Sequence, residues 1–173
     1  MITYRKAALQ DIPEILGCLR GVYGDHSYYS SYYDPAYLRE IIDNIFTADA
    51  DGEVVGTLVL SPWGCDGNDR ELGAFLVRSD VRKSNIGTGL LAYTLDAISG
   101  LPSVKGVPIT YNTGSQSIVG ELGFIPSGML FGTIDMNLLT AGKAESAEKK
   151  PLILVVRNFN VTDIGEIYVP PPL

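Results

Sequence analysis

The sequence is poor in cysteine and histidine. Among its 173 residues there are two cysteines, Cys18 and Cys65, and one histidine, His26. Two cysteines without a CxxC pair or a histidine cluster do not provide the ligand set of a structural zinc site. They also fall short of the cysteine content of small disulfide-stabilised secreted domains. We therefore expect neither a structural metal nor a disulfide framework.

Basic residues and long apolar runs are also scarce. The chain has 13 Lys and Arg against 20 Asp and Glu, a formal net charge of -7 and a pI near 4.6. Binding to nucleic acid depends on Lys and Arg that neutralise phosphates, so we expect no bulk nucleic-acid partner. The opening MITYRKAALQ lacks the apolar stretch of a signal peptide, and no apolar run approaches the roughly 20 residues that cross a bilayer. A cytoplasmic protein without a membrane partner is expected.

The chain does contain enough apolar residues to build one core. Hydrophobic residues make up 46% of the sequence and charged residues 19%, which is typical of a globular domain. Apolar residues at helical spacing predict a helix over 11–23, with Asp11 as N-cap and Glu14 in capping-box register. Six tyrosines then interrupt the periodicity of residues 23–37, which predicts a loop, and a second helix is expected over 38–45.

Strands and helices alternate after this point. The Asp-Gly pair at Gly52 predicts a hairpin turn between two antiparallel strands. The elements expected beyond it are strand 54–60, strand 71–77, helix 87–99, strand 107–111, helix 115–122, strand 129–138 and strand 151–159. This order predicts an α/β fold.

The last part of the chain carries a break in composition. Residues 140–150, TAGKAESAEKK, are small and charged, which predicts a flexible surface loop. Consecutive prolines close the chain in IYVPPPL and cannot donate to a strand ladder, so this ending resembles a domain boundary. We expect one domain in residues 1–139, the loop in 140–150, and a C-terminal strand extension of the same domain in 151–173.

One strand-to-helix junction has a distinctive chemistry. Strand 71–77 is followed by the basic pair Arg82 and Lys83, and Gly87 and Gly89 lie at the start of the next helix. A helix N-terminus presents unpaired N–H groups and about half a positive charge, and glycine lets an anion approach the backbone. Two interpretations remain open at this point. The glycines either form part of a phosphate cradle or only allow a tight turn and close helix packing.

The spacing at this junction excludes two common phosphate motifs. The dinucleotide fingerprint needs a third glycine in the first βαβ turn, and the Walker motif needs GK[ST]. The stretch from Arg82 to Gly87 instead resembles the [RQ]-x-x-G-x-[GA] acyl-CoA loop of the GNAT superfamily of N-acetyltransferases, which follows a strand like that of Glu71 to Val77. Asn85 stands where that family has glycine, and asparagine tolerates a positive φ better than other non-glycine residues.

The resemblance covers about residues 2 to 133. ITYRKAALQDIPEILGCLR is similar to the opening of the family, DGEVVGTLVL to its second and third strands, and YNTGSQSIVGELGF to a later segment. It implies a mixed, mostly antiparallel central sheet flanked by helices, with an extra C-terminal strand. VYGDHSYYSSYYDPAYL and GSQSIVGELGFIPSGMLFG look most like the acetyltransferase halves of longer bacterial chains with an anti-sigma-factor-like ATPase module downstream.

The resemblance also implies residues that bind acetyl-CoA. The backbone of strand 71–77, where it splays from strand 107–111, would hold the pantetheine arm, and the loop and helix start would hold the pyrophosphate. For Asn112 the alternative is an ordinary turn residue at a strand end. The implied cofactor-binding residues are Phe75, Leu76, Val77, Arg82, Lys83, Ser84, Asn85, Ile86, Gly87, Thr88, Asn112 and Ser115.

Acetyl transfer to an amine needs a base, oxyanion donors and an acid for the leaving thiolate. By the same resemblance Glu71 is the candidate base and the backbone N–H of Val77 the oxyanion donor. A solvated charge at the start of the strand is the alternative for Glu71. Val119 replaces a tyrosine that many members use as the acid, so Tyr111 and the tyrosines of residues 23–37 are the substitutes.

The sequence leaves two main functions open. One is an acetyl-CoA-dependent N-acetyltransferase that transfers directly to an amine within a ternary complex. The other is an acyl-CoA-sensing module with little or no catalysis, which the departures at Asn85 and Val119 favour. A third and remoter function is assembly through an exposed strand edge in residues 151–169, which would also allow a homodimer.

Three other residues carry weaker hypotheses. His26 follows an aspartate but has no nucleophile nearby in sequence, so a loop histidine is the simpler interpretation. Cys65 has no visible activating base. Trp63 and the tyrosine segment either line an acceptor pocket or cover the core. The amine acceptor itself is not identified by the sequence.

Overall fold

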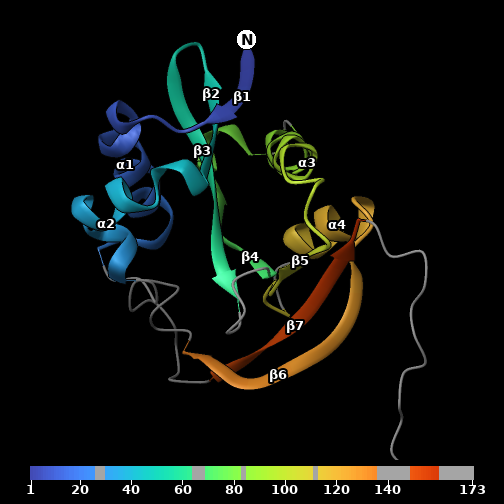
Figure 1. Cartoon of the computed structure of the whole chain (residues 1–173). Coiled ribbons are helices and arrows are strands. Elements are labelled where there is room, and N and C mark those ends of the chain that lie inside the picture. Colours follow the sequence, from blue (N-terminus) through green and yellow to red (C-terminus); the bar gives the residue numbers. More distant parts are fainter. Residues whose placement is uncertain (26–29, 64–68, 83–84, 111–112, 136–148, 160–173) are drawn as a thin grey trace, which may run out of the picture.

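A single seven-stranded sheet forms the centre of the molecule (Figure 1). The computed structural model describes residues 1–25, 30–63, 69–82, 85–110, 113–135 and 149–159. The strand order is β1-β2-β3-β4-β5-β7-β6, and every neighbouring pair is antiparallel except β4 and β5. The strands are β1 Ile2–Lys6, β2 Ile45–Ala50, β3 Glu53–Trp63, β4 Asp69–Val77, β5 Ser103–Gly106, β6 Ile125–Asp135 and β7 Lys149–Asn158. The expected mixed, mostly antiparallel sheet is confirmed.

Helices cover both faces of this sheet. Figure 1 shows α1 and α2 on one face and α3 and α4 on the other. The helices are α1 Ile12–Tyr23, α2 Pro35–Glu40, α3 Ile86–Ala97 and α4 Thr113–Glu121, with short 3-10 helices η1 Leu9–Asp11, η2 Ser30–Tyr33, η3 Ile42–Asn44 and η4 Ser79–Val81. In the part of the chain that the structure describes, no helix combines the length and apolarity needed to cross a bilayer.

Each face has its own apolar core. Leu90 and Leu91 of α3 are fully buried against the sheet, together with Val119 of α4. On the other face, Ile15 of α1 and Leu38 of α2 are buried against β3 and β4. Burying such side chains contributes about 1.5–3 kcal/mol each, so the two cores hold both helical layers to the sheet.

The contacts at the start of α1 differ from the capping box that the sequence predicts. Asp11 makes no side-chain cap hydrogen bond to α1, and its carboxylate instead accepts from Ala8 N at 2.7 Å and from the Arg5 guanidinium. Glu14 Oε2 accepts from Val54 N of β3 at 2.6 Å. The predicted capping box is therefore wrong, because both carboxylates satisfy tertiary partners rather than the first helical turn. The helix itself is confirmed.

Other element boundaries also differ from the prediction, among them those of β6, which spans Ile125–Asp135 and not 129–138. The helix expected over 38–45 is α2, which begins at Pro35 because Asp34 accepts from Ala36 N, and Ile45 already belongs to β2. The strand expected over 107–111 is β5 at Ser103–Gly106, and Ile109 makes only an isolated bridge to Leu152. The N-terminal strand β1 was not expected. Propensity alone cannot place β1 and β5, because pairing with β2 and β7 decides them.

The C-terminal strand β7 lies inside the sheet. Its residues pair with β5 on one side and with β6 on the other. The predicted strand is confirmed, but an exposed edge for assembly in 151–158 is wrong, since both edges are paired. Residues 140–148 of the predicted loop and residues 160–173 lie outside the described ranges.

Candidate active site

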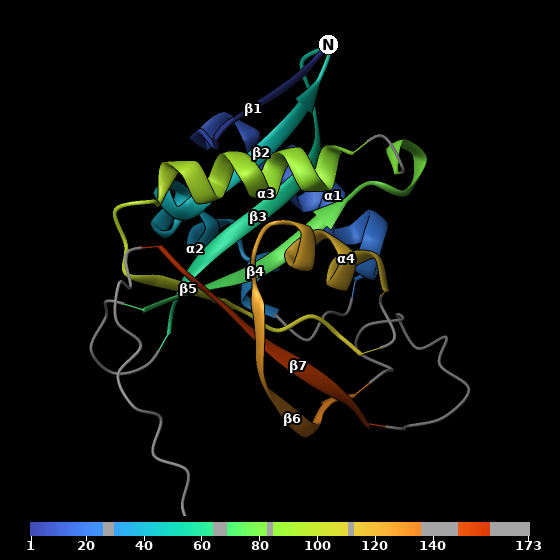
Figure 2. The ribbon, with the colours of Figure 1, turned by 90° about the vertical axis from the view of Figure 1, so that its right-hand side faces the viewer.

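The sheet opens between β4 and β5. The two strands pair in register only at Glu71 with Lys105 and at Leu72 with Gly106. Beyond Gly106 the chain leaves toward α4, and Figure 2 shows β6 and β7 running away from the β1–β4 part of the sheet. On its β5 side, the rest of β4 from Gly73 to Val77 therefore has no strand partner among the described residues. The predicted splay is present, with β5 rather than 107–111 as its second strand.

A bulge lies at the point where β4 leaves β5. The β3–β4 register shifts between Thr57 and Val59, and Ala74 has a φ of 42°, in the left-handed region. The Thr57 hydroxyl donates to Ala74 O at 3.2 Å and is itself buried. Bulges of this kind re-aim the strand at functional sites. Nothing in the sequence indicated a positive φ at an alanine.

The backbone of Val77 faces the open side of β4. Arg78 N donates to Val55 O at 2.8 Å, so the alternation of an antiparallel ladder turns the Leu76 groups toward β3 and those of Val77 away from it. Arg82 Nε donates to Val77 O at 3.1 Å, which confirms this direction. By the same alternation Phe75 shares the open side. Of the three predicted backbone contacts, Leu76 is thus the one turned to β3.

The helix that follows begins with an unusual residue. Asn85, the N-cap of α3, has a φ of 59° and a ψ of 13°, a left-handed conformation. The residue that replaces the family's glycine therefore adopts the conformation that favours glycine. The first amides of α3, from Ile86 to Thr88, have no partner inside the helix, as at any helix start. Lys83 and Ser84 lie outside the described residues.

Packing accounts for both glycines of this junction. A Cβ on Gly87 would lie 3.2 Å from Ile118 Cδ1, and a Cβ on Gly89 would lie 2.1 Å from the Tyr4 hydroxyl. With larger residues at these positions, Ile118 of α4 and Tyr4 of β1 would have to move. Close packing therefore explains why Gly87 and Gly89 are glycines. The phosphate-cradle hypothesis rests instead on the first amides of α3, on Asn85 and on Arg82.

Glu71 lies at the closed end of the splay. It stands opposite Ser61 of β3 and Lys105 of β5, and its side chain is half-buried. Burial raises the pKa of the Glu71 carboxyl above its ordinary value. A carboxylate deprived of water is a stronger base than a solvated one. Glu71 is therefore not the fully solvated charge of the alternative interpretation.

The remaining predicted site residues divide into two groups. Ser115 is half-buried in the first turns of α4, and Val119 is buried in the core at 7% exposure. Val119 therefore contributes packing and no acid. Other candidates lie in ranges that the structure does not describe or have side chains that it does not describe: His26, Trp63, Cys65, Tyr111 and Asn112.

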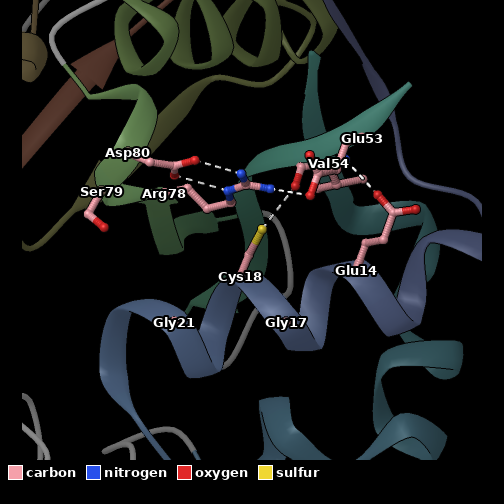
Figure 3. Close-up of a pocket in the computed structure, with 9 residues that line it drawn as sticks. All are labelled: Glu14, Gly17, Cys18, Gly21, Glu53, Val54, Arg78, Ser79 and Asp80. Atoms are coloured by element: carbon pink, nitrogen blue, oxygen red, sulfur yellow. Dashed lines mark hydrogen bonds and ion pairs between the residues drawn. The ribbon is translucent and has the colours of Figure 1, made fainter. Parts of the chain in front are cut away.

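A cavity of about 380 Å³ lies beyond the C-terminal end of β4, between α1 and the turn after β4 (Figure 3). Arg78 bridges the carboxylates of Glu53 and Asp80 across it, and Cys18 Sγ donates to Val54 O at 3.2 Å. Burial raises the pKa of the Cys18 thiol to about 11, so this cysteine is inert at neutral pH. None of the predicted site residues lines this cavity.

The sequence profile of the Acetyltransferase (GNAT) family matches residues 9–124. The chain belongs to this family. The match takes in the open edge of β4, the Asn85 junction and α4 of this GNAT chain. The expected family and the expectation of an acetyltransferase are confirmed.

Solved structures share the GNAT fold at low sequence identity. A GNAT acetyltransferase from Streptococcus pneumoniae has a TM-score of 0.75 at 15% identity and covers 92% of this chain and 100% of its own. YncA from Salmonella typhimurium, solved with its cofactor acetyl-CoA, has a TM-score of 0.75 at 14% identity, with coverage of 96% and 98%. Diaminobutyrate acetyltransferase EctA from Paenibacillus lautus, solved with L-2,4-diaminobutyric acid and coenzyme A, has a TM-score of 0.71 at 17% identity, with coverage of 95% and 99%. A comparison with curated protein sequences gives no significant match.

Proposed function

We propose that this chain is an acetyl-CoA-dependent N-acetyltransferase that moves an acetyl group to an amine by direct transfer in a ternary complex. The observation that carries the proposal is the open edge of β4 beside the N-terminus of α3. An unpaired strand edge binds an extended amide-containing ligand as an added strand would. YncA and EctA, solved with acetyl-CoA and coenzyme A, support the choice of cofactor.

The residues present fit this cofactor. The backbone of Phe75 and Val77 supplies donors and acceptors for the pantetheine amides, and the first amides of α3 supply donors for the pyrophosphate. Arg82, which donates to Val77 O, stands between the two and contributes a cation. Acetyl-CoA, when bound, supplies the acetyl group as a reactive thioester. Lys83, Ser84, Asn112 and Ser115 remain proposed contacts from the family resemblance.

Glu71 is the proposed general base. An amine attacks only as the free base, so Glu71 first takes the ammonium proton through ordered water. The N–C bond then forms, and the C–S bond of the thioester breaks to release the thiolate of coenzyme A. The N–H of Val77 is the proposed donor to the acetyl oxygen. Tyr111 remains the proposed acid for the thiolate, which can also leave without strong acid assistance.

A calorimetric titration tests the foundation of the proposal. We expect acetyl-CoA to bind the wild-type chain, and Arg82→Ala to weaken binding by about 5- to 30-fold because a charge-assisted contact is lost. Arg39→Ala on α2, which removes an exposed arginine outside the site, is the matched control and should bind as wild type. No binding of acetyl-CoA at millimolar concentration would contradict the proposal.

A turnover assay distinguishes a catalytic enzyme from an acyl-CoA-sensing module. The alternative, an acyl-CoA-sensing module, rested on Asn85 and Val119, but Asn85 keeps the glycine-like conformation and the comparisons do not favour this function. We expect free thiol to be released when acetyl-CoA is combined with a panel of primary amines. Tight coenzyme binding with no turnover across a broad panel would favour the sensing module instead.

A further inference from the structure

The tyrosine segment reaches β4 through one side chain. Tyr32, in the 3-10 helix η2, is 5% exposed. Its hydroxyl lies 2.9 Å from Ser61 Oγ on β3, in a hydrogen bond that either group can donate. The ring of Tyr37 on α2 packs against it in a tilted arrangement, at a centroid distance of 5.9 Å. The sequence did not single out Tyr32 among the six tyrosines of this segment.

Gly73 makes room for the Tyr32 hydroxyl. A Cβ at Gly73 would lie 3.1 Å from this oxygen, closer than side-chain carbons normally approach. Gly73 is not among the residues with a positive φ, so its backbone does not require glycine. Space for Tyr32 is therefore the physical reason for glycine at this position of β4.

Glu71 lies on the same face of β4 as this contact. Ser61 and Glu71 are direct partners in the β3–β4 register, and partners in an antiparallel pair project to the same face. Leu72, which projects the other way, belongs to the core under α3. The Tyr32 hydroxyl thus stands over a patch made by Ser61, Glu71 and Gly73, at the closed end of the splay.

We infer that Tyr32, held by Ser61, is a positioning residue whose ring covers Glu71 on the acceptor side and forms a roof over it. This roof keeps water from the Glu71 carboxylate. It also limits the size of the amine that can reach the carboxylate. This inference rests on the proposed acetyltransferase function and deepens it. A phenol ring at this place fills the space above Gly73. Small primary amines fit beneath such a roof, and branched or secondary amines do not.

The charges around this patch agree with the inference. Burial raises the pKa of Glu71. Burial is also the main cause of the raised pKa of Tyr32; the bond to Ser61 opposes it, and Tyr37 and then Glu71 add smaller contributions that raise it. Tyr32 therefore stays protonated at neutral pH and can donate a hydrogen bond. In the described part of the chain, Lys105 of β5 and Tyr37 of α2 also face this region.

The test compares three variants by their pH profiles. Tyr32→Ala removes the roof, Tyr32→Phe keeps the ring without the hydroxyl, and Ser61→Ala removes the anchor. Tyr33→Phe, which removes the hydroxyl that donates to Gly24 O, is the matched control. We expect the acidic limb of kcat/KM in Tyr32→Ala to move down by about half a pH unit or more, because Glu71 is hydrated again. Tyr32→Phe should move it less.

A second readout is the size of the accepted amine. In Tyr32→Ala the ratio of kcat/KM for a branched amine to that for a linear one should rise about 10-fold, which is the discrimination that steric fit in such a site provides. Acetyl-CoA affinity should be unchanged, because the cofactor lies along the open edge of β4. If Tyr32→Ala fails to fold, Gly73→Ala, which pushes against the Tyr32 hydroxyl, is tested by the same two measurements.

The outcomes separate this inference from the proposed function. An unchanged pH limb and an unchanged amine ratio in variants that bind acetyl-CoA would overturn the role of Tyr32 and leave the acetyltransferase intact. If the wild type turns over no amine, the proposed function fails, and the Glu71 carboxyl is then titrated directly by carbon-13 NMR. A Glu71 pKa that does not fall in Tyr32→Ala overturns the roof in that case also.

Discussion

Asn85 shows how one residue can keep a backbone conformation while changing the side chain. It stands in the left-handed region at the N-cap of α3, where the family pattern has glycine. Asparagine visits this region at lower cost than alanine, for which it costs about 1–2 kcal/mol. The substitution therefore leaves the helix start in place, and the departure from the motif does not by itself remove the anion site.

Two variants at this position separate backbone from side chain. Asn85→Gly should leave stability within about 1 kcal/mol and preserve acetyl-CoA affinity, because the conformation is retained. Asn85→Ala should lower Tm by about 2–6 °C and weaken acetyl-CoA binding, since the helix start is strained. Thermal unfolding and calorimetry measure both. Equal behaviour of the two variants would mean that the φ of Asn85 is irrelevant to the site.

Glu71 carries a trade-off between function and stability. Its folded pKa is raised, so the folded state binds a proton more tightly than the unfolded one, and stability declines as pH rises through the interval above 4.5. Glu71→Gln should therefore raise Tm by about 1–4 °C at pH 7 and lose this gain below pH 4.5. Acetyl transfer should fall by about 10²- to 10⁴-fold. A lower Tm at pH 7 would show that the carboxylate is stabilised where it lies.

At the scale of elements, an ion-pair network joins β1, η1 and β2. Arg5 donates through Nε to Asp49 at 2.6 Å and through its two terminal nitrogens to Asp11 at 2.6 and 3.0 Å. The bond to Arg5 and the bond from Ala8 N lower the pKa of Asp11 against the effect of burial. The network ties the first strand to the turn that begins α1.

Removing one partner of this network should destabilise the fold in a pH-dependent way. Asp11→Asn should reduce the free energy of unfolding at pH 7 by about 1–2 kcal/mol, because Arg5 is partly solvated. The folded pKa of Asp11 is depressed, so its contribution is present above pH 3.8 and is lost as pH falls through the folded value. Urea titrations at pH 7 and pH 3 measure the difference. An equal loss at both pH values would exclude a role for the Asp11 charge.

The same elements show what sequence could and could not provide. The helices over 11–23 and 87–99 followed from their apolar spacing, because one face of each is buried. Strand 71–77 followed from its apolar run, because both helical layers cover it. The start of α2 was missed although Asp34 before Pro35 is a local N-cap signal. The position of β5 did not follow, since it pairs with β7 from a distant part of the chain. The bulge at Ala74 and the reach of Tyr32 to Ser61 depend on neighbours 17 to 29 positions away in sequence, which local patterns do not encode.

At the scale of the whole molecule, the sheet is completed by a strand from the end of the chain. β7 lies between β5 and β6, and Phe159 just beyond it packs on the core and donates through N to Pro102 O at 3.0 Å. Without β7, neither β5 nor β6 would keep a full set of partners. Strand β5 therefore depends on a neighbour that lies outside residues 9–124, the segment that the family profile matches.

Truncation tests this dependence. Ending the chain after residue 148 should abolish cooperative unfolding, because β5 and β6 lose their common neighbour. Ending it after Phe159 keeps every described contact and should unfold cooperatively with a Tm within a few degrees of the full chain. Circular dichroism on heating distinguishes the two. Cooperative unfolding of the shorter chain would show that β1–β4 folds as an independent unit.

The brief contact between β4 and β5 gives the sheet a seam. In the described residues, β1–β4 are joined to β5–β7 only by the pairs at Glu71 and Leu72, and β4 and β5 separate immediately afterwards. A ligand bound along the open edge of β4 would connect β1–β4 with β5–β7. Its arrival should therefore slow the exchange of amide hydrogens with solvent in β5 and β7, in residues that it never touches.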